Sequence, residues 1–175
     1  MNKPTGMACA TLLLCASGAL RAADGFAGVQ CGSDVPKALL GRTMPNERVA
    51  ALEERHKDLG LKDLGGSEVS DDVFLASWRI CGKEYQLLEE KDVVRDVLAF
   101  PPHSKDAPAF IGSCKANAKA VPGTIVAVLQ GNEGKDDLPA TAAWRIDEAG
   151  KRFVKVPTEG LLCARDGVIT ADGGR

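Results

Sequence analysis

From Val73 onward the apolar residues of this chain recur at every second position, and this alternation limits the possible folds more than any other feature. Within residues 73–81 (VFLASWRIC), four apolar side chains share one face of an extended chain: Phe74, Ala76, Trp78 and Ile80. Ser77 and Arg79 share the opposite face. Such alternation is typical of a strand that packs on one side in an antiparallel sheet.

Further segments with strand character follow along the chain. We expect strands over residues 85–88, 93–100, 110–114, 124–130 and 161–164. The segment 124–130 (TIVAVLQ) is apolar on both faces, which predicts a central position in the sheet. The segments 142–146 (AAWRI) and 152–156 (RFVKV) flank a turn that contains Gly150, so they predict a β-hairpin.

The preceding residues carry helical signals instead. Asn46 can cap a helix over residues 47–59, and Gly60 can end it in a left-handed conformation. One stripe of this helix is mostly apolar and consists of Val49, Leu52, His56 and Leu59. Residues 60–72 then predict a connecting loop, because they contain Gly65 and Gly66.

A shorter helix is expected over residues 33–40. Ser33 or Asp34 can begin it, and Pro36 fits its first turn. Together these patterns predict an α+β fold, in which a helical or irregular segment (31–65) covers one opening or face of an antiparallel sheet (73–164). We expect six to eight strands in a strongly curled or barrel-like sheet, and a frayed tail at 169–175. The lack of alternating helices excludes a doubly wound nucleotide-binding fold.

The N-terminus has the layout of an export signal. Residues 7–16 (MACATLLLCA) are uncharged, but the apolar run stops well short of the roughly 20 residues that a membrane span needs. Small residues fit cleavage after Ala22 or Ala23, and Ser17 and Ala19 offer an earlier site. Cleavage after Ala22 would remove a signal peptide at 1–22 and leave one secreted domain at 23–175. No small residue directly precedes Cys15 or Cys31, which disfavours a lipid anchor, and no membrane insertion is expected after cleavage.

Four cysteines remain after this cleavage: Cys31, Cys81, Cys114 and Cys163. An even number of cysteines in an exported chain predicts two disulfides, with three possible connectivities. We prefer Cys31–Cys163 with Cys81–Cys114, because the termini of compact domains often lie close together. No two of these cysteines are closely spaced, so no metal site is expected.

The charge of the mature chain argues against two classes of partner. Without Lys3 and Arg21 the formal charge of −2 becomes −4, which offers nothing to nucleic acid or to an anionic membrane. Acidic pairs occur at 71–72, 89–90 and 136–137, and we interpret them as solvated turns. The acidic residues 132–137 lack the alternating spacing of a calcium loop.

Residues that could carry catalytic chemistry are few. No nucleophile elbow, zinc-protease helix, phosphate loop or dinucleotide fingerprint is present, and no cofactor is expected. Of the two histidines, His56 lies on the predicted helix stripe, where a structural role is favoured. His103 lies in the loop 100–108, which three prolines stiffen. We predict a recognition surface there, formed by Phe100, His103, Ser104 and Lys105.

The strand 93–100 presents a charge on each of its faces. Arg95 lies on one face and Asp96 on the other, so whichever face is buried receives a charge. Three explanations stay open, in this order: an edge strand protected by an inward charge, a buried ion pair, and a polar residue that lines a ligand cavity.

These features favour a small exported binding or inhibitory module of the bacterial-type cell envelope. Its partner is an unknown envelope protein or small ligand, and its location is the periplasm or the exterior. The alternative is a small envelope hydrolase that uses His103 with an acidic partner such as Asp96 or Asp106. A purely structural envelope component is a third possibility.

Overall fold

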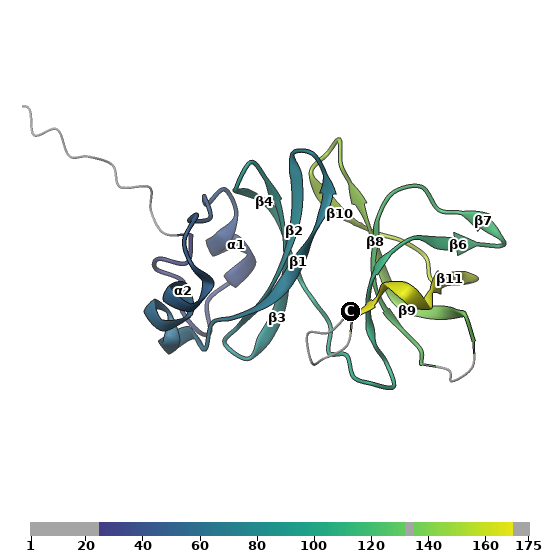
Figure 1. Ribbon diagram of the computed structural model, residues 1–175, viewed down its shortest axis with the longest axis horizontal. Coiled ribbons are helices and arrows are strands. Elements are labelled where there is room, and N and C mark those ends of the chain that lie inside the picture. Colours follow the sequence, from purple (N-terminus) through teal and green to yellow (C-terminus); the bar gives the residue numbers. More distant parts are fainter. Residues whose placement is uncertain (1–24, 132–134, 170–175) are drawn as a thin grey trace, which may run out of the picture.

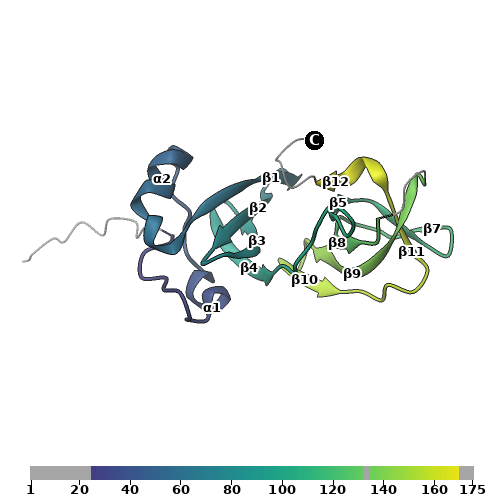
Figure 2. The ribbon, with the colours of Figure 1, turned by 90° about the horizontal axis from the view of Figure 1, so that it is seen from below.

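Two antiparallel sheets lie side by side in the computed structural model, which describes residues 25–131 and 135–169 (Figure 1). The predicted signal peptide and residues 170–175 of the predicted tail lie outside the described residues. Residues 25–61 cover the face of the first sheet that points away from the second, and the two views agree on this arrangement (Figure 2).

The first sheet is a four-stranded meander in the order β1-β2-β3-β4. Its strands are β1 (Lys62–Ser70), β2 (Val73–Ile80), β3 (Lys83–Glu90) and β4 (Val93–Ala99). Two-residue turns with positive φ at both positions join β2 to β3 (Cys81, 53°; Gly82, 75°) and β3 to β4 (Lys91, 51°; Asp92, 64°). This turn geometry matches the right-handed twist of the strands, so β2, β3 and β4 pair along most of their length.

The second sheet has the order β12-β5-β8-β9-β11-β6-β7, and β10 pairs with β9 outside this path. Its strands are β5 (Ala109–Gly112), β6 (Cys114–Ala116), β7 (Lys119–Ala120), β8 (Ile125–Leu129), β9 (Asp137–Asp147), β10 (Arg152–Lys155), β11 (Leu161–Ala164) and β12 (Val168–Ile169). A 3-10 turn, η2 (Arg165–Gly167), precedes β12. Every residue of β8 is buried, which confirms its predicted central position, and β9 and β10 form the predicted hairpin.

Side chains from the inner faces of both sheets form a shared core. The first sheet and the residue that follows it contribute Val73, Leu75, Leu88 and Phe100. The second sheet contributes Ala109, Val126, Val128 and Ile146. Because alternate residues point to opposite faces, the other residues of β2 and β3 are left to face the N-terminal segment.

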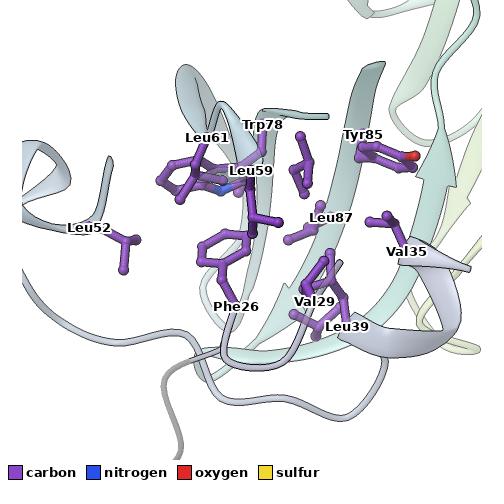
Figure 3. Packing of buried hydrophobic residues seen from close by; sticks show 13 residues of the cluster. Phe26, Val29, Val35, Leu39, Leu52, Leu59, Leu61, Trp78, Tyr85 and Leu87 are labelled. Atoms are coloured by element: carbon purple, nitrogen blue, oxygen red, sulfur yellow. The ribbon is translucent and has the colours of Figure 1, made fainter. Parts of the chain in front are cut away.

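The N-terminal segment packs on that opposite face. Its short elements are α1 (Val35–Leu39), α2 (Val49–Arg55) and the 3-10 turn η1 (Lys57–Leu59). Figure 3 shows Phe26 and Leu59 beside Trp78, while Val35 and Leu39 of α1 lie near Leu87. The rings of Phe26 and Trp78 meet edge to face, with centroids 5.1 Å apart.

The predicted single curled or barrel-like sheet of six to eight strands is wrong, because the described residues form twelve strands in two sheets. The terminal strands β1 and β4 of the first sheet do not pair, and neither do β12 and β7 of the second, so both sheets are open. The predicted helical N-terminal segment is also wrong, because α1 has five residues and α2 seven, with irregular chain between them. In the described part of the chain, no helix has the length and apolar character needed to span a membrane.

The helix predicted over residues 47–59 is shorter than its pattern suggested. Arg48, not Asn46, is the N-cap residue of α2, and the cap has no side-chain hydrogen bond. The chain tightens into η1 after His56, and Gly60 ends it with φ of 56° as predicted. Asp34 caps α1 by accepting a hydrogen bond from the backbone N–H of Lys37.

Residues 62–70, predicted to be a loop, form β1 instead. The strand carries two glycines and few large apolar residues, so it lacks the usual strand signal. Gly65 adopts φ of 94° at a bulge, and a Cβ at Gly66 would lie 2.6 Å from the carbonyl oxygen of Leu75. The glycines therefore allow a close approach to β2 that side chains would prevent.

The preferred disulfide connectivity is also wrong, although two disulfides are present as predicted. Cys31 pairs with Cys81, and Cys114 pairs with Cys163. The first bond joins the N-terminal segment to the β2–β3 turn. The second joins directly opposed residues of β6 and β11, with Cα atoms 4.1 Å apart. Each bond thus braces one sheet, and both indicate an oxidising environment, periplasmic or extracellular.

Candidate functional site

An open groove lies on the outer face of the first sheet, beside the residues that the N-terminal segment covers. Its volume is about 440 Å³, and the lining comes from residues 44–52 on one side and from β1, β2 and β3 on the other. A second recess of about 280 Å³ lies near the β1–β2 and β3–β4 turns. The two share Phe74, Glu89 and Asp92, so they form one continuous surface, hereafter the groove and the recess.

The alternation of side chains along β2 determines which residues form the apolar floor of the groove. Phe74, Ala76 and Trp78 fall on the outer face of β2, as their alternation predicted, and line the groove. Phe74 is 43% exposed, and Val49 on the facing wall is 41% exposed. Large hydrophobic side chains this exposed number only four in the described residues, and two of them flank the groove. An exposed apolar pair within one concave surface is typical of a binding site.

Glu89 is the unexpected residue of this surface. It follows Tyr85 and Leu87 on the outer face of β3 and is only 7% exposed. Within the described parts of the chain, its carboxylate has no hydrogen bond or ion pair. A buried carboxylate without a partner costs stability, so such a group is uncommon in a purely structural position.

Burial raises the pKa of Glu89 to about 7, and the nearby charge of Asp92 adds to this effect. The low-dielectric surroundings disfavour the ionised carboxylate, and a second negative charge disfavours it further. Glu89 therefore exchanges its proton near neutral pH, whereas an ordinary glutamate is fully ionised there.

Three further carboxylates line the groove. Oε2 of Glu47 accepts a hydrogen bond from Nη2 of Arg55 at 2.8 Å, but Oε1 of Glu47 is buried and has no hydrogen-bond partner. Oδ1 of Asp63 accepts from the backbone N–H of Gly65 at 3.0 Å. Asp92 is exposed at the mouth. No lysine, arginine or histidine belongs to the described lining of the groove.

The carboxylates are spread along the groove and do not converge on one point. Among residues 25–131 and 135–169, no three side chains of the metal-binding types lie close enough together to hold a metal ion. In the recess, Nζ of Lys91 lies 3.6 Å from Oδ2 of Asp72, so its cation already has an acidic neighbour.

Comparisons of this chain with protein-family models, with curated proteins and with solved structures find no match. The function is therefore inferred from the site itself.

The predicted recognition loop lies elsewhere, at the end of β4. Phe100 is buried in the core between the sheets, and its ring centroid lies 5.6 Å from that of His103. Nε2 of His103 lies 3.5 Å from Oε2 of Glu84, and the histidine side chain is 15% exposed. The acidic neighbour of His103 is thus Glu84 and neither of the predicted Asp96 and Asp106.

The tip of this loop is a tight turn. The backbone N–H of Ser104 donates to the carbonyl of Ala107 at 2.9 Å, and the hydroxyl of Ser104 accepts from the N–H of Ala107 at 3.2 Å. Lys105 and Asp106 are exposed, and the carbonyl of Asp106 accepts from the N–H of Gly131. The loop is braced at both ends, and its contact with a partner stays a prediction.

Both charged residues of β4 have a partner in the structure. β4 is an edge strand, and exposed Arg95 pairs with Glu90 at 3.0 Å. Oδ2 of Asp96 accepts a hydrogen bond from the backbone N–H of Phe153 in β10, at 2.7 Å. This arrangement matches the first explanation, an edge strand with an inward charge, and Asp96 also links the two sheets through a backbone group.

Sequence reasoning missed the groove because one of its walls is the irregular segment at 44–48. The interpretation of the acidic pair 89–90 as a solvated turn is wrong, since both residues belong to β3 and Glu89 is buried. Tyr85, Leu87 and Glu89 share one face of β3, and extension of the strand predicted at 85–88 by one residue would have placed Glu89 there.

Proposed function

We propose that this protein is an exported binding module of the bacterial-type cell envelope, and that the groove is its binding surface. Two disulfides support an extracytoplasmic location, and the apolar run at 7–16 supports export through a signal peptide. The location of its partner decides whether the protein acts in the periplasm or outside the cell.

The observation that carries this proposal is Glu89 in the floor of a concave, partly apolar surface. A chain that only had to fold would gain stability from an uncharged residue at this place. Local features that cost stability without a structural benefit concentrate at functional sites. A ligand that hydrogen-bonded to the carboxylate and covered Phe74 and Val49 would offset the cost of the buried carboxylate and the cost of the exposed apolar surface.

The scaffold around the groove is suited to binding. The wall at 44–52 is tied to the sheet by the Thr43–Val93 bridge and by the hydrogen bond that the backbone N–H of Met44 donates to the carbonyl of Asp92 at 2.7 Å. Because the walls are fixed before a ligand arrives, less conformational entropy is lost on association.

The hydrolase alternative rests on His103 and now on its neighbour Glu84. In the described residues, no hydroxyl or thiol hydrogen-bonds to His103, whereas activation of a nucleophile needs such a contact. The binding module is therefore the better-supported proposal.

The proposal is tested by capture from envelope extract with matched variants. Phe74→Ala removes an exposed ring in the groove, and Leu162→Ala removes an equally exposed side chain from β11 of the second sheet. We expect a captured partner to be retained by wild type and by Leu162→Ala but lost from Phe74→Ala. Equal capture by both variants, or turnover of an envelope substrate by the purified protein, would contradict the proposal.

A His103→Ala/Lys105→Ala variant tests the predicted loop in the same experiment. Both side chains belong to the 100–108 loop, and neither lines the groove. Loss of the partner from this double variant with retention by Phe74→Ala would move the binding surface to the loop.

A further inference from the structure

We propose that the groove receives a lysine or arginine side chain presented by a partner protein, and that Glu89 is the group that pairs with its charge. This inference rests on the proposed binding function and adds the chemical class of the ligand. It is carried by four features of the described residues: charge, an unsatisfied buried acceptor, the aromatic floor and the open shape.

The charge of the groove is one-sided. Its lining contains four carboxylates, from Glu47, Asp63, Glu89 and Asp92, and no basic side chain. Only Glu47 has an ion pair, with Arg55, so three of the four carry no counter-charge within the described chain. Low-dielectric walls concentrate the field of such a cluster, which attracts a cation and repels an anion.

One buried acceptor and one buried acidic residue without an ion pair show that the cluster is more than a solvated acidic surface. The carboxylate of Glu89 is in a residue that is 7% exposed, and Oε1 of Glu47 is buried without a hydrogen-bond partner. Solvated acidic residues satisfy their oxygens with water, but Oε1 of Glu47 is shielded from solvent and most of the Glu89 residue is buried. A donor that enters the groove would supply the missing hydrogen bonds.

The floor fits the rest of a long basic side chain. Phe74 lies opposite Glu89 in the β2–β3 pairing, and Ala76 and Trp78 continue the floor along β2. The methylene stem of lysine or arginine packs on such apolar surface while its charged head reaches a carboxylate. A cation above an aromatic ring gains further attraction from the ring's quadrupole.

The open shape favours a segment of protein chain over a free small molecule. Small-molecule sites usually enclose most of their ligand, but this groove is open and continues into the recess through Phe74, Glu89 and Asp92. The exposed rim residues Val49 and Phe74 offer apolar contacts beyond the cation itself. A basic residue flanked by apolar neighbours would cover both, as hot-spot residues do at protein interfaces.

The test uses small probes of the side chain alone. N-acetylarginine methylamide and N-acetyllysine methylamide carry the charge, and N-acetylcitrulline methylamide is a neutral analogue of the first. Binding is followed by the fluorescence of Trp78 in a Trp144→Phe background, because Trp144 is the other tryptophan of the chain. Glu89→Gln removes the receiving charge, and Glu148→Gln removes the same charge from an exposed position in the β9–β10 turn.

We expect both basic probes to bind at millimolar concentration or below and the citrulline probe to bind at least about tenfold more weakly. Glu89→Gln should weaken the basic probes by at least about tenfold near pH 8, while Glu148→Gln leaves their affinity unchanged. Amide exchange spectra of both variants verify that the fold is retained.

Equal binding of arginine and citrulline probes, or an unchanged affinity in Glu89→Gln, would overturn this inference. Tighter binding of free putrescine than of the lysine probe would assign the groove to a small diamine and contradict a protein segment. If Phe74→Ala still loses a captured partner while the basic probes fail to bind, the binding module stands and only the ligand class is wrong.

Discussion

The carboxylate of Asp96 in β4 accepts a hydrogen bond from the backbone N–H of Phe153 in β10, 57 residues away in sequence, at 2.7 Å. The other carboxylate oxygen accepts from the N–H of Val97 at 2.9 Å. One acidic side chain thus satisfies a backbone donor of each sheet. This contact and the apolar core between the sheets hold the two sheets in a fixed relation.

Replacement of Asp96 should therefore destabilise the protein. Asp96→Ala leaves the half-buried N–H of Phe153 without an acceptor, and we expect a loss of about 1–3 kcal/mol in the free energy of unfolding. Asp96→Asn keeps an acceptor and should lose less. The neighbouring Arg95→Ala removes only an exposed ion pair and should change stability by less than about 1 kcal/mol. Urea unfolding measures all three, and equal effects at positions 95 and 96 would contradict this role of Asp96.

The disulfide pairing has a direct chemical test. Proteolysis of the unreduced protein should release peptides that join Cys31 to Cys81 and Cys114 to Cys163. Each bond closes a loop of about 50 residues, so Cys31→Ala/Cys81→Ala should lower the free energy of unfolding by about 2–5 kcal/mol. A peptide that joins Cys31 to Cys163 would contradict the structure.

The sequence predicts those parts of the fold that depend on the pattern of neighbouring residues. The strand at 73–80 and the central position of β8 follow from local pattern, and both are confirmed. The expected packing of this strand on one side only is wrong, because Val73 and Leu75 face the second sheet while Trp78 faces the N-terminal segment. β1 carries no such pattern, because its glycines serve contact with β2 and become interpretable only once β2 is in place. Disulfide pairing and sheet closure depend on long-range packing, and the sequence alone did not resolve them.

The candidate site was harder to predict than the strands. The groove arises where residues 44–52 meet three strands, and no single segment contains its lining. The predicted loop residues Phe100 and His103 are turned toward the core and toward Glu84 instead. Only Glu89 offered an early signal, since its place in the alternation of β3 conflicts with a solvated turn.

Glu89 should make stability fall as the pH rises toward neutral. Its pKa is raised from 4.5 to about 7 by folding, so between these values the folded protein holds a proton that the unfolded chain has lost. The stabilisation is complete below about pH 4.5 and is lost as the pH rises through about 7. Thermal or urea unfolding of Glu89→Gln against wild type from pH 5 to 8 isolates this contribution. The variant should be more stable near pH 8 by about 2–3 kcal/mol.

Other charged groups near Glu89 are common to both proteins in that comparison, so their effects cancel in the difference. They are Lys91 and Asp92 on the β3–β4 turn, Asp71 and Asp72 on the β1–β2 turn, Asp63 and Glu68 on β1, and Glu47 before α2. A difference between the two proteins that does not change from pH 5 to 8 would contradict the raised pKa of Glu89.

A substitution at Asp92 tests ligand binding separately from protein stability. It adopts φ of 64° in the β3–β4 turn, a left-handed conformation that glycine adopts more readily. Asp92→Gly should therefore leave stability unchanged or raise it by about 1 kcal/mol, although it removes a charge from the mouth of the groove. Affinity for the basic probes should fall nonetheless. A variant that is less stable and binds equally well would show that Asp92 serves the turn and not the ligand.

The most direct test of the central claim is the titration of the Glu89 carboxyl by carbon-detected NMR, assigned with Glu89→Gln. In the free protein the midpoint should lie near 7, because burial and the charge of Asp92 raise the pKa of Glu89. At saturation with N-acetylarginine methylamide the midpoint should fall, because a bound cation favours the ionised carboxylate. A midpoint near 4.5 in the free protein, or one that saturation leaves unchanged, would contradict the assignment of Glu89 as the cation-receiving group.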